Sequence, residues 1–242
     1  MKRFVKKLAN SMGIKIVRQL SPKARVPPAL MDFLRSRSVV TVYDVGANTG
    51  QYAIGLRQRG YRGRIISFEP VREVFLTLEK AAKSDTTWIT HNLALGAEAG
   101  IATINVTQGT EFSSMLPISE AALRHSADAT VVRVDPITVA TLDSLADRDD
   151  LDRAFLKIDA QGFEEKVLAG SSDILEKFAG VQLELPVEHM YNGDWSLSEA
   201  LRYMADRGFV PSQIYPMNRL AYDPVSIIEV DCIFRRADSR SA

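Results

Sequence analysis

Apolar positions along the chain recur in two alternating patterns, which predict short strands separated by helices. The expected strands cover residues 39–45, 64–69, 86–90, 154–159, 180–185, 209–215 and 226–235. Helical spacing follows four of them, over residues 51–59, 71–82, 163–174 and 197–205, and a Ser196–Glu199 capping box opens the last. Strands that alternate with such helices predict an α/β domain with a doubly wound, mostly parallel seven-stranded sheet.

Two regions depart from this alternation. Residues 101–107 and 130–139 are further expected strands, and the segment 108–129 between them has weak periodicity, which favours a lid or a substrate-binding loop. The last two strands of the chain follow each other through a turn-rich connection. We therefore expect an antiparallel pair of strands at one edge of the sheet.

The first twenty residues predict an amphipathic helix, because apolar residues recur at helical spacing with basic residues between them. Two interpretations stay open: a helix packed on the domain, or a basic surface helix on an anionic membrane or a partner. A proline-rich linker leads to residue 28, the main domain covers residues 29–236, and the polar tail 237–242 is expected to be disordered.

The composition narrows the classes of partner and location. The 30 basic and 30 acidic side chains cancel, and no basic stripe with interleaved aromatic residues indicates nucleic acid. The single cysteine, Cys232, lies in an apolar run, which makes a reducing, cytoplasmic environment the default. No apolar run approaches the roughly 18 residues of a membrane-spanning helix. We expect a cytoplasmic protein, with peripheral membrane contact through residues 1–20 as the open alternative, and the oligomeric state stays undetermined.

Candidate chemistry begins at the turn after the first expected strand, in the stretch VYDVGANTGQYA at residues 42–53. Ligands of open α/β sheets bind beyond the carboxyl ends of the strands. Gly46 and Gly50 let the backbone approach a ligand, and Asn48 tolerates the left-handed conformation that a glycine would otherwise supply. Neither a dinucleotide fingerprint nor a P-loop is present. The Asp44 carboxylate would repel a diphosphate and attract an amino group, which favours a cationic, phosphate-free nucleoside.

Glu69 ends the second expected strand, in the stretch ISFEP. A carboxylate at this place can accept hydrogen bonds from two vicinal ribose hydroxyls, as the acidic residue of dinucleotide folds does. A ribose with both hydroxyls free, attached to a cationic group, indicates S-adenosylmethionine.

Six blocks of sequence carry a resemblance to a known family: VYDVGANTGQYA (42–53), ISFEP (66–70), HNLALG (91–96), VATLDSL (139–145), FLKIDAQGFEEKVLAG (155–170) and VQLELP (181–186). Together they resemble the FkbM family of class I methyltransferases. The resemblance implies a seven-stranded sheet with its last pair reversed and S-adenosylmethionine as cofactor. It also implies methyl transfer, usually to a hydroxyl oxygen, on sugars, glycans or other secondary metabolites.

Carried over residue by residue, the resemblance assigns the cofactor to seven positions: Asp44, Gly46, Asn48 and Gly50 at the methionine-side turn, Glu69 at the ribose, and Asn92 and Ala94 near the adenine edge. The Ser113-Ser114 pair also resembles the family, and we expect its hydroxyls to bind the acceptor. The resemblance fades after Pro186, so it leaves the acceptor undefined.

Two carboxylates are candidates for the chemistry, because a base must take the acceptor's proton as the methyl group is displaced in line. Asp159 and Glu184 end the fourth and fifth expected strands, so they would face one cleft if these strands are neighbours. We expect Asp159 to act as general base or to orient the acceptor hydroxyl. Lys157 shares a face with Asp159, which favours an ion pair, and Glu164 is expected to stabilise the start of the next helix.

His189, in the loop after Glu184, is a further candidate for the base or for a ligand of the acceptor. With Asp159, Glu184 and Glu188 it could instead hold a divalent metal such as magnesium, and this alternative stays open.

The leading hypothesis is an S-adenosylmethionine-dependent O-methyltransferase acting on a hydroxyl of a sugar, glycolipid or related secondary metabolite. Two alternatives stay open: a methyltransferase for a carboxylate or a polyketide hydroxyl, and a non-catalytic cofactor-binding module. Such a module would keep Asp44 and Glu69 but would not need Asp159.

Overall fold

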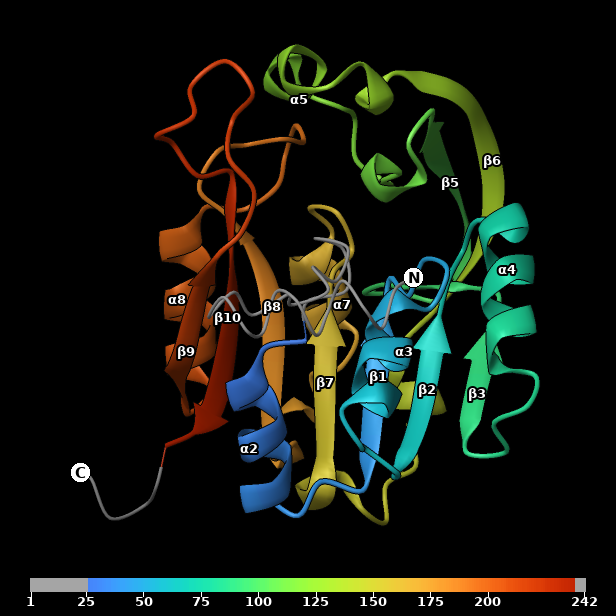
Figure 1. The fold of residues 1–242 in the computed structure, drawn as a ribbon, viewed down its shortest axis with the longest axis vertical. Helices are drawn as coiled ribbons and strands as arrows, with labels where there is room; N and C mark the ends of the chain where they lie inside the picture. The colour runs from blue at the N-terminus through green and yellow to red at the C-terminus, as the bar shows by residue number, and fades with distance from the viewer. Residues whose placement is uncertain (1–25, 238–242) are drawn as a thin grey trace, which may run out of the picture.

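The computed structural model describes residues 26–237 and is built around a seven-stranded sheet with the order β3-β2-β1-β7-β8-β10-β9 (Figure 1). Its strands are β1 (Thr41–Val45), β2 (Arg64–Phe68), β3 (Trp88–His91), β7 (Ala154–Ile158), β8 (Gly180–Pro186), β9 (Phe209–Pro216) and β10 (Glu229–Arg236). Strand β10 is antiparallel to both β8 and β9, and the other pairings are parallel. The predicted doubly wound sheet with an antiparallel edge pair is confirmed.

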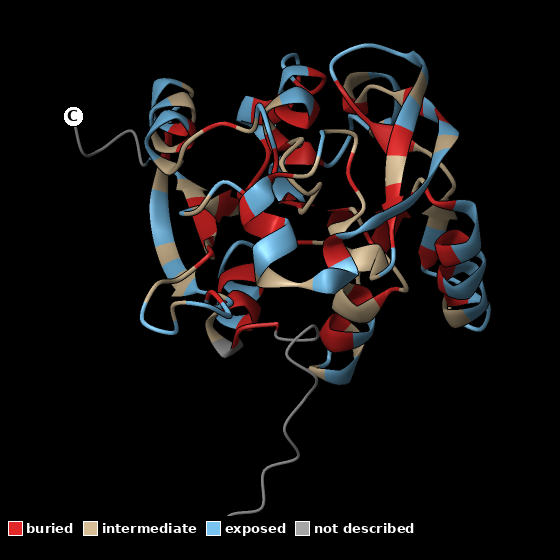
Figure 2. Cartoon of the chain, turned by 90° about the horizontal axis from the view of Figure 1, so that it is seen from above, coloured by how far each residue is buried: buried red, intermediate tan, exposed pale blue. Residues whose placement is uncertain are grey.

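Helices cover both faces of this sheet. One face packs against α2 (Pro28–Ser36), α3 (Gln51–Gln58) and α4 (Arg72–Ala82), and the other against α6 (Leu142–Leu145), α7 (Glu164–Ala169) and α8 (Leu197–Asp206). Val42 and Tyr43, neighbours in β1, enter different apolar clusters because side chains alternate along a strand. In the view from above (Figure 2), the outer helices carry exposed residues on one side and buried residues on the other, as amphipathic helices do.

Two helices differ from the expectation. Helix α2 was not predicted, although Pro28 at its first turn is a common helix start and Leu30, Phe33 and Leu34 are buried beneath it. Helix α7 ends at Ala169, before a glycine, and is therefore shorter than the predicted helix over residues 163–174.

A second sheet lies beside the first and carries the segment 108–129. Its strands are β4 (Ala94–Leu95), β6 (Val131–Ala140) and β5 (Gly100–Thr107), in the order β4-β6-β5, so the further strands are confirmed but form a sheet of their own. Residues 108–129, which we name the cap, contain η2 (Thr110–Phe112), α5 (Glu120–His125) and η3 (Ala127–Ala129). The cap lies above the carboxyl ends of the central strands (Figure 1) and packs on Met190, Tyr191, Leu220 and Ile228.

Short elements complete the described chain: η4 (Leu151–Arg153) precedes β7, and η5 (Leu175–Lys177) precedes β8. The amphipathic helix predicted over residues 1–20 and nearly all of the predicted tail lie outside the described residues. Within residues 26–237, no helix combines the length and apolar character needed to cross a bilayer.

Candidate active site

The turn after β1 is built from residues in the left-handed backbone region. Gly46 has φ +70° and Asn48 has φ +48°, as expected for an asparagine in a glycine-like position. A Cβ on Gly46 would lie 1.8 Å from the carbonyl oxygen of Asp159, so no side chain fits there. The Asn48 side chain supports the turn, because its Oδ1 accepts the N–H of Thr49 at 2.8 Å. Gly46, Ala47 and Asn48 line a cavity above the sheet.

Gly50 has a different role from the one predicted. Its φ is +89°, but it lies outside the lining of that cavity. A Cβ at Gly50 would meet the Trp88 side chain at 2.8 Å and the Leu78 side chain at 3.0 Å. Gly50 therefore lets helix α3 start close to the core, and it supports the turn from below rather than facing a ligand.

Asp44 is fully buried and does not line the cavity, which corrects the expectation that it meets a cofactor amino group. The positive charge beside it belongs to the chain: Lys157 Nζ lies 3.1 Å from Asp44 Oδ1. Ser67 Oγ donates to Asp44 Oδ2 at 3.2 Å, and Trp88 Nε1 donates in turn to Ser67 Oγ at 3.0 Å. Asp44 therefore fixes the base of the turn.

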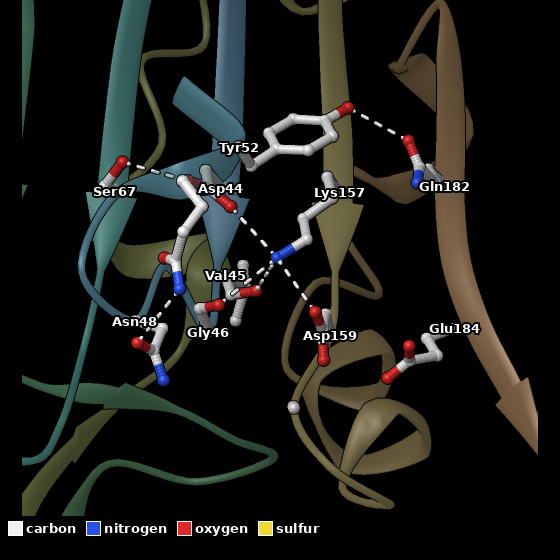
Figure 3. Close-up of polar contacts among 12 residues, drawn as sticks. Asp44, Val45, Gly46, Asn48, Tyr52, Ser67, Lys157, Asp159, Gln182 and Glu184 are labelled. Carbon is white, nitrogen blue, oxygen red and sulfur yellow. Dashed lines mark hydrogen bonds and ion pairs between the residues drawn. The ribbon is translucent and has the colours of Figure 1, made fainter. Parts of the chain in front are cut away.

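Lys157 lies between the turn and Asp159 (Figure 3). Its Nζ donates to the carbonyl oxygens of Val45 and Gly46, each at 3.2 Å, and lies 3.5 Å from Asp159 Oδ2. Burial alone would lower the pKa of Lys157, but the carboxylates of Asp44 and Asp159 raise it above its ordinary value. The predicted ion pair is confirmed, and it reaches two carboxylates.

Glu69 lines the cavity beside the glycine turn. Its two oxygens accept the backbone N–H groups of Asn48 and Val71, each at 2.9 Å. Burial raises the pKa of Glu69 to about 7, although these hydrogen bonds and Lys157 oppose the rise. Each carboxylate oxygen keeps a second acceptor position, so the pair can receive two hydroxyl groups of a diol.

The two residues predicted near the adenine edge separate in the structure. Ala94 is buried and lines the cavity together with Leu93 and Leu95. Asn92 lies outside this lining; its Nδ2 donates to the carbonyl oxygens of Glu69 at 2.9 Å and of Pro70 at 3.0 Å. Asn92 therefore holds the backbone that carries Glu69, and only Ala94 has the predicted place.

The cavity has a volume of about 430 Å³ and lies between the turn, the carboxyl ends of β7 and β8, and the cap. This volume lies in the range of small-molecule sites, on the order of 300–1,000 Å³. Its wall opposite Glu69 is acidic and contains Asp159, Glu184, Glu229 and Asp231. Apolar side chains of the cap, including Phe112 and Met115, also line it.

Asp159 and Glu184 face this cavity together, as predicted. Strands β7 and β8 are parallel neighbours with Ile158 paired to Leu183, so the two carboxylates leave the sheet side by side. The Asp159 side chain is 33% exposed. Burial, with repulsion from Asp159, raises the pKa of Glu184 well above its ordinary value.

Glu229 and Asp231 were not predicted as site residues. They alternate along β10, and Asp231 pairs with Glu184 across the antiparallel ladder. Burial raises the pKa of Glu229 to about 7 and that of Asp231 to about 6, with Asp159 adding to both. Their spacing of two residues in the stretch EVDCIF placed them on one face of a strand, and this signal could have identified them.

Two residues of the stretch after β7 shape the acidic wall. Glu164, the first residue of α7, accepts the N–H groups of Ala160 at 2.8 Å and Gly162 at 3.2 Å through Oε1, so it holds the stretch before the helix, and its effect on the helix start stays a prediction. Gln161 contacts two carboxyl groups of this wall. Its Nε2 lies 2.6 Å from Asp159 Oδ1 and 3.1 Å from Glu184 Oε2.

The serine pair of the cap lies at the cavity, but both hydroxyls form hydrogen bonds within the protein. Ser114 is 1% exposed; its Oγ donates to the Gln161 carbonyl oxygen at 2.6 Å and accepts the Leu116 N–H at 3.0 Å. It therefore ties the cap to the stretch after β7, which corrects its predicted role as an acceptor ligand. Ser113 Oγ accepts the Thr107 N–H at 3.2 Å and lines the cavity, so its role stays a prediction.

His189 does not lie at the cavity, which corrects its prediction as base or acceptor ligand. Its side chain is 55% exposed and pairs with Asp194. In the part of the chain that the structure describes, no group of three or more His, Cys, Asp or Glu side chains is arranged to hold a metal ion. The predicted set of Asp159, Glu184, Glu188 and His189 is therefore not assembled.

Comparison with known structures places this sheet among methyltransferase folds. The magnesium protoporphyrin IX methyltransferase ChlM from Synechocystis PCC 6803, solved with bound SAM, superposes with a TM-score of 0.50 at 12% identity over 98% of this chain and 97% of its own. Sp1610 from Streptococcus pneumoniae, solved with S-adenosyl-L-methionine, gives a TM-score of 0.48 at 11% identity over 90% of this chain and 76% of its own. Comparison with proteins of curated function gave no match.

The family follows from the sequence itself. The model of the methyltransferase FkbM domain matches residues 44–211, well over half of the chain and the part that builds the turn, the cap and the Asp159 and Glu184 side of the acidic wall. This range contains Glu69, Lys157, Asp159 and Glu184. The chain belongs to the FkbM family of S-adenosylmethionine-dependent methyltransferases.

Proposed function

We propose that the chain transfers the methyl group of S-adenosylmethionine to a hydroxyl oxygen of a sugar or a related glycoconjugate. The observation that carries the proposal is the placement of Asp159 and Glu184 across one cavity from Glu69 and the glycine turn. A methyl donor held at the turn would thereby face two carboxyl groups, with the cavity between the donor and these groups available to an alcohol.

The residues on the cofactor side fit the donor. Glu69 keeps one acceptor position on each carboxylate oxygen, which suits the two ribose hydroxyls. Phe68, Leu93, Ala94 and Leu95 give the neighbouring wall an apolar surface suited to an adenine ring. When bound, S-adenosylmethionine would supply an activated methyl group on a sulfonium centre.

Asp159 is the residue we assign to the acceptor proton. The acceptor oxygen forms a bond to the methyl carbon, the carbon–sulfur bond breaks, and the hydroxyl proton passes to a carboxylate. Asp159 is partly exposed and lines the cavity, whereas burial and repulsion from Asp159 raise the pKa of Glu184. Glu184 in its protonated form can donate a hydrogen bond to an acceptor oxygen and so orient it.

The acidic wall favours a polyol over an acid as the acceptor. Hydroxyl groups can donate to Asp159, Glu229 and Asp231, whereas a carboxylate acceptor would be repelled by the same oxygens. The apolar side chains of Phe112 and Met115 offer the C–H face of a sugar ring a surface to stack on.

Radiolabelled S-adenosylmethionine and a panel of methyl glycosides, polyketide alcohols and carboxylic acids would test the proposal. We expect label on a glycoside, a loss of about 10²–10⁴-fold in kcat for Asp159→Asn, and retained cofactor binding by calorimetry. Asp206→Asn, an exposed residue at the end of α8, is the matched control. Transfer to acids or polyketides without transfer to any glycoside would contradict the proposal.

A further inference from the structure

Gln161 lies between the two carboxylates that the proposed chemistry uses. Its Nε2 donates to Asp159 Oδ1 at 2.6 Å and to Glu184 Oε2 at 3.1 Å. Its Oε1 accepts the hydroxyl of Tyr191 at 2.5 Å. One neutral amide therefore connects the ends of β7 and β8 with the loop that follows β8.

The network fixes which end of the amide faces the carboxylates. A carboxylate only accepts hydrogen bonds, so the NH₂ group of Gln161 has to face Asp159, and it then also donates to Glu184. The opposite orientation would place the amide oxygen against carboxylate oxygens and the NH₂ group against the Tyr191 hydroxyl. Tyr191, buried under the cap, donates its hydroxyl to the amide oxygen and so supports this orientation.

The backbone conformation that places the Gln161 side chain here is an unfavourable one. Gln161 has φ +56°, a left-handed conformation that is unfavourable for a residue with a Cβ. Such strain persists where the surroundings impose it. Here Ser114 Oγ donates to the Gln161 carbonyl oxygen, and Glu164 holds the N–H groups on both sides, at Ala160 and Gly162. The cap and α7 thus fix the backbone of Gln161.

Asp159 is held on both of its oxygens. Oδ1 receives the Gln161 amide at 2.6 Å, and Oδ2 lies 3.5 Å from Lys157 Nζ. The carboxylate plane is therefore defined by one contact on each side, and the remaining acceptor positions face the cavity that Asp159 lines.

We propose that Gln161 is a positioning residue for methyl transfer, whose amide holds Asp159 and Glu184 at a fixed separation for the acceptor hydroxyl. The inference rests on the proposed function. It predicts that loss of the amide disturbs turnover and the titration of the carboxylates while leaving the cofactor side of the cavity unchanged.

The charges around Glu184 determine the sign of the titration effect. Asp159 at the end of β7 and Glu229 and Asp231 on β10 all face it and favour its neutral form. The Gln161 NH₂ group is a donor that stabilises the ionised form. Replacing that donor by an apolar group should move the Glu184 titration to higher pH, and with it the alkaline limb of the kcat profile, where Glu184 loses the proton that it donates to the acceptor oxygen.

The test uses Gln161→Met, which keeps the chain length and removes the donors, and Tyr191→Phe, which frees the amide to rotate. Gln213→Met is the matched control, because Gln213 Oε1 also accepts a tyrosine hydroxyl, from Tyr215 at 2.7 Å, while its Nε2 donates to the Ala29 carbonyl oxygen. Measurements are kcat against pH with the methyl glycoside that the wild type methylates, S-adenosylmethionine affinity by calorimetry, and ¹³C titration of the Glu184 carboxyl carbon.

We expect Gln161→Met to lower kcat about 10²-fold, Tyr191→Phe to lower it about tenfold, and both to bind the cofactor normally. Unchanged kcat and Glu184 titration in Gln161→Met would overturn the inference. A parallel loss of kcat and cofactor affinity would also overturn it, because Gln161 would then only maintain the fold. Should Gln161→Met not fold, Tyr191→Phe decides by the same criteria.

If the proposed function is wrong, the measurements give a different pattern from the one expected if only the inference about Gln161 is wrong. The wild type would then label no glycoside, yet the Glu184 titration would still be measurable in each variant. A shift confined to Gln161→Met and Tyr191→Phe would support the amide link, and identical titrations in all variants would overturn it.

Discussion

The two walls of the cavity are built in different ways. The cofactor wall comes mainly from one continuous stretch, residues 44–71, in which backbone conformation at Gly46 and Asn48 and backbone donors to Glu69 form the surface. The acceptor wall gathers side chains from β7, β8, β10 and the cap, which are distant in sequence. The first wall is a local motif, and the second exists only once the sheet order and the β8–β10 pairing are set.

Charge separates the walls as well. Lys157 joins them, because its ammonium group contacts Asp44 below the turn and Asp159 at the acceptor side. Among the described residues that line the cavity, it is the one lysine or arginine. Burial, with repulsion from Asp159, raises the pKa values of the carboxyl groups further along the acceptor wall, Glu184, Glu229 and Asp231. Asp44 at the base of the turn is neutralised by Lys157, whereas the acceptor wall holds three neighbouring carboxyl groups with raised pKa values.

Replacing Lys157, which contacts both walls, should have the largest effect on stability. Lys157→Met leaves Asp44 buried without its cation, which should lower the free energy of unfolding by about 3–5 kcal/mol. Urea denaturation followed by circular dichroism measures this change. In the double variant Asp44→Asn with Lys157→Met the unpaired charge is absent, so most of the stability should return. A double variant as unstable as the single one would contradict the ion-pair explanation.

The close backbone approach at Gly46 should give the next largest effect. Gly46→Ala adds a Cβ where the Asp159 carbonyl oxygen lies at 1.8 Å, and φ is +70°, so we expect a loss of about 2–4 kcal/mol and impaired cofactor binding. Gly208→Ala is the matched control, because Gly208 has φ +76° but no atom within 4 Å of the added Cβ. It isolates the cost of conformation, about 1–2 kcal/mol. Equal losses in the two variants would show that the approach to Asp159 carries no cost.

The same contrast between the two walls explains which features could be predicted from the sequence. The mostly parallel sheet with its antiparallel edge pair, the left-handed Asn48 and the strand-end placement of Asp159 and Glu184 follow from local pattern and from rules of α/β topology. The predicted ligand contact of Asp44 was wrong, because a sequence does not reveal that the lysine of the fourth expected strand, Lys157, lies 3.1 Å from it.

The acceptor wall was harder to predict for the same physical reason. Gln161 acts through a side-chain conformation fixed by Tyr191 and by Ser114, which comes from a cap without periodicity. The prediction for His189 rested on its side-chain chemistry alone, and the loop instead turns this side chain away from the cavity to pair with Asp194. Residue type identified candidates, but the direction of each side chain depended on contacts distant in sequence.

Replacing the Glu69 side chain tests the cofactor wall while leaving the backbone of that wall in place. Glu69→Ala deletes an acceptor for the N–H groups of Asn48 and Val71 and for the ribose hydroxyls, so S-adenosylmethionine should bind about 10²-fold more weakly, as for lost hydrogen bonds to a charged group. Calorimetric titration measures the affinity. Glu73→Ala, at an exposed position on α4, provides the control. Unchanged affinity in Glu69→Ala would remove the ribose assignment.

The pH dependence of cofactor binding should be a smaller effect and the sharpest test of that assignment. The pKa of Glu69 is raised to about 7, above its ordinary value, so protonation stabilises the fold, and this contribution is lost as pH rises towards 7. Ribose hydroxyls instead donate to the ionised carboxylate, so affinity should fall about tenfold from about pH 8 to about pH 6. Glu164 and Glu229 have pKa values raised into the same range, so the comparison has to isolate Glu69. Glu69→Gln removes the titration at this one position and should give a flat profile, whereas a dependence that persists in Glu69→Gln would assign it to the acceptor wall.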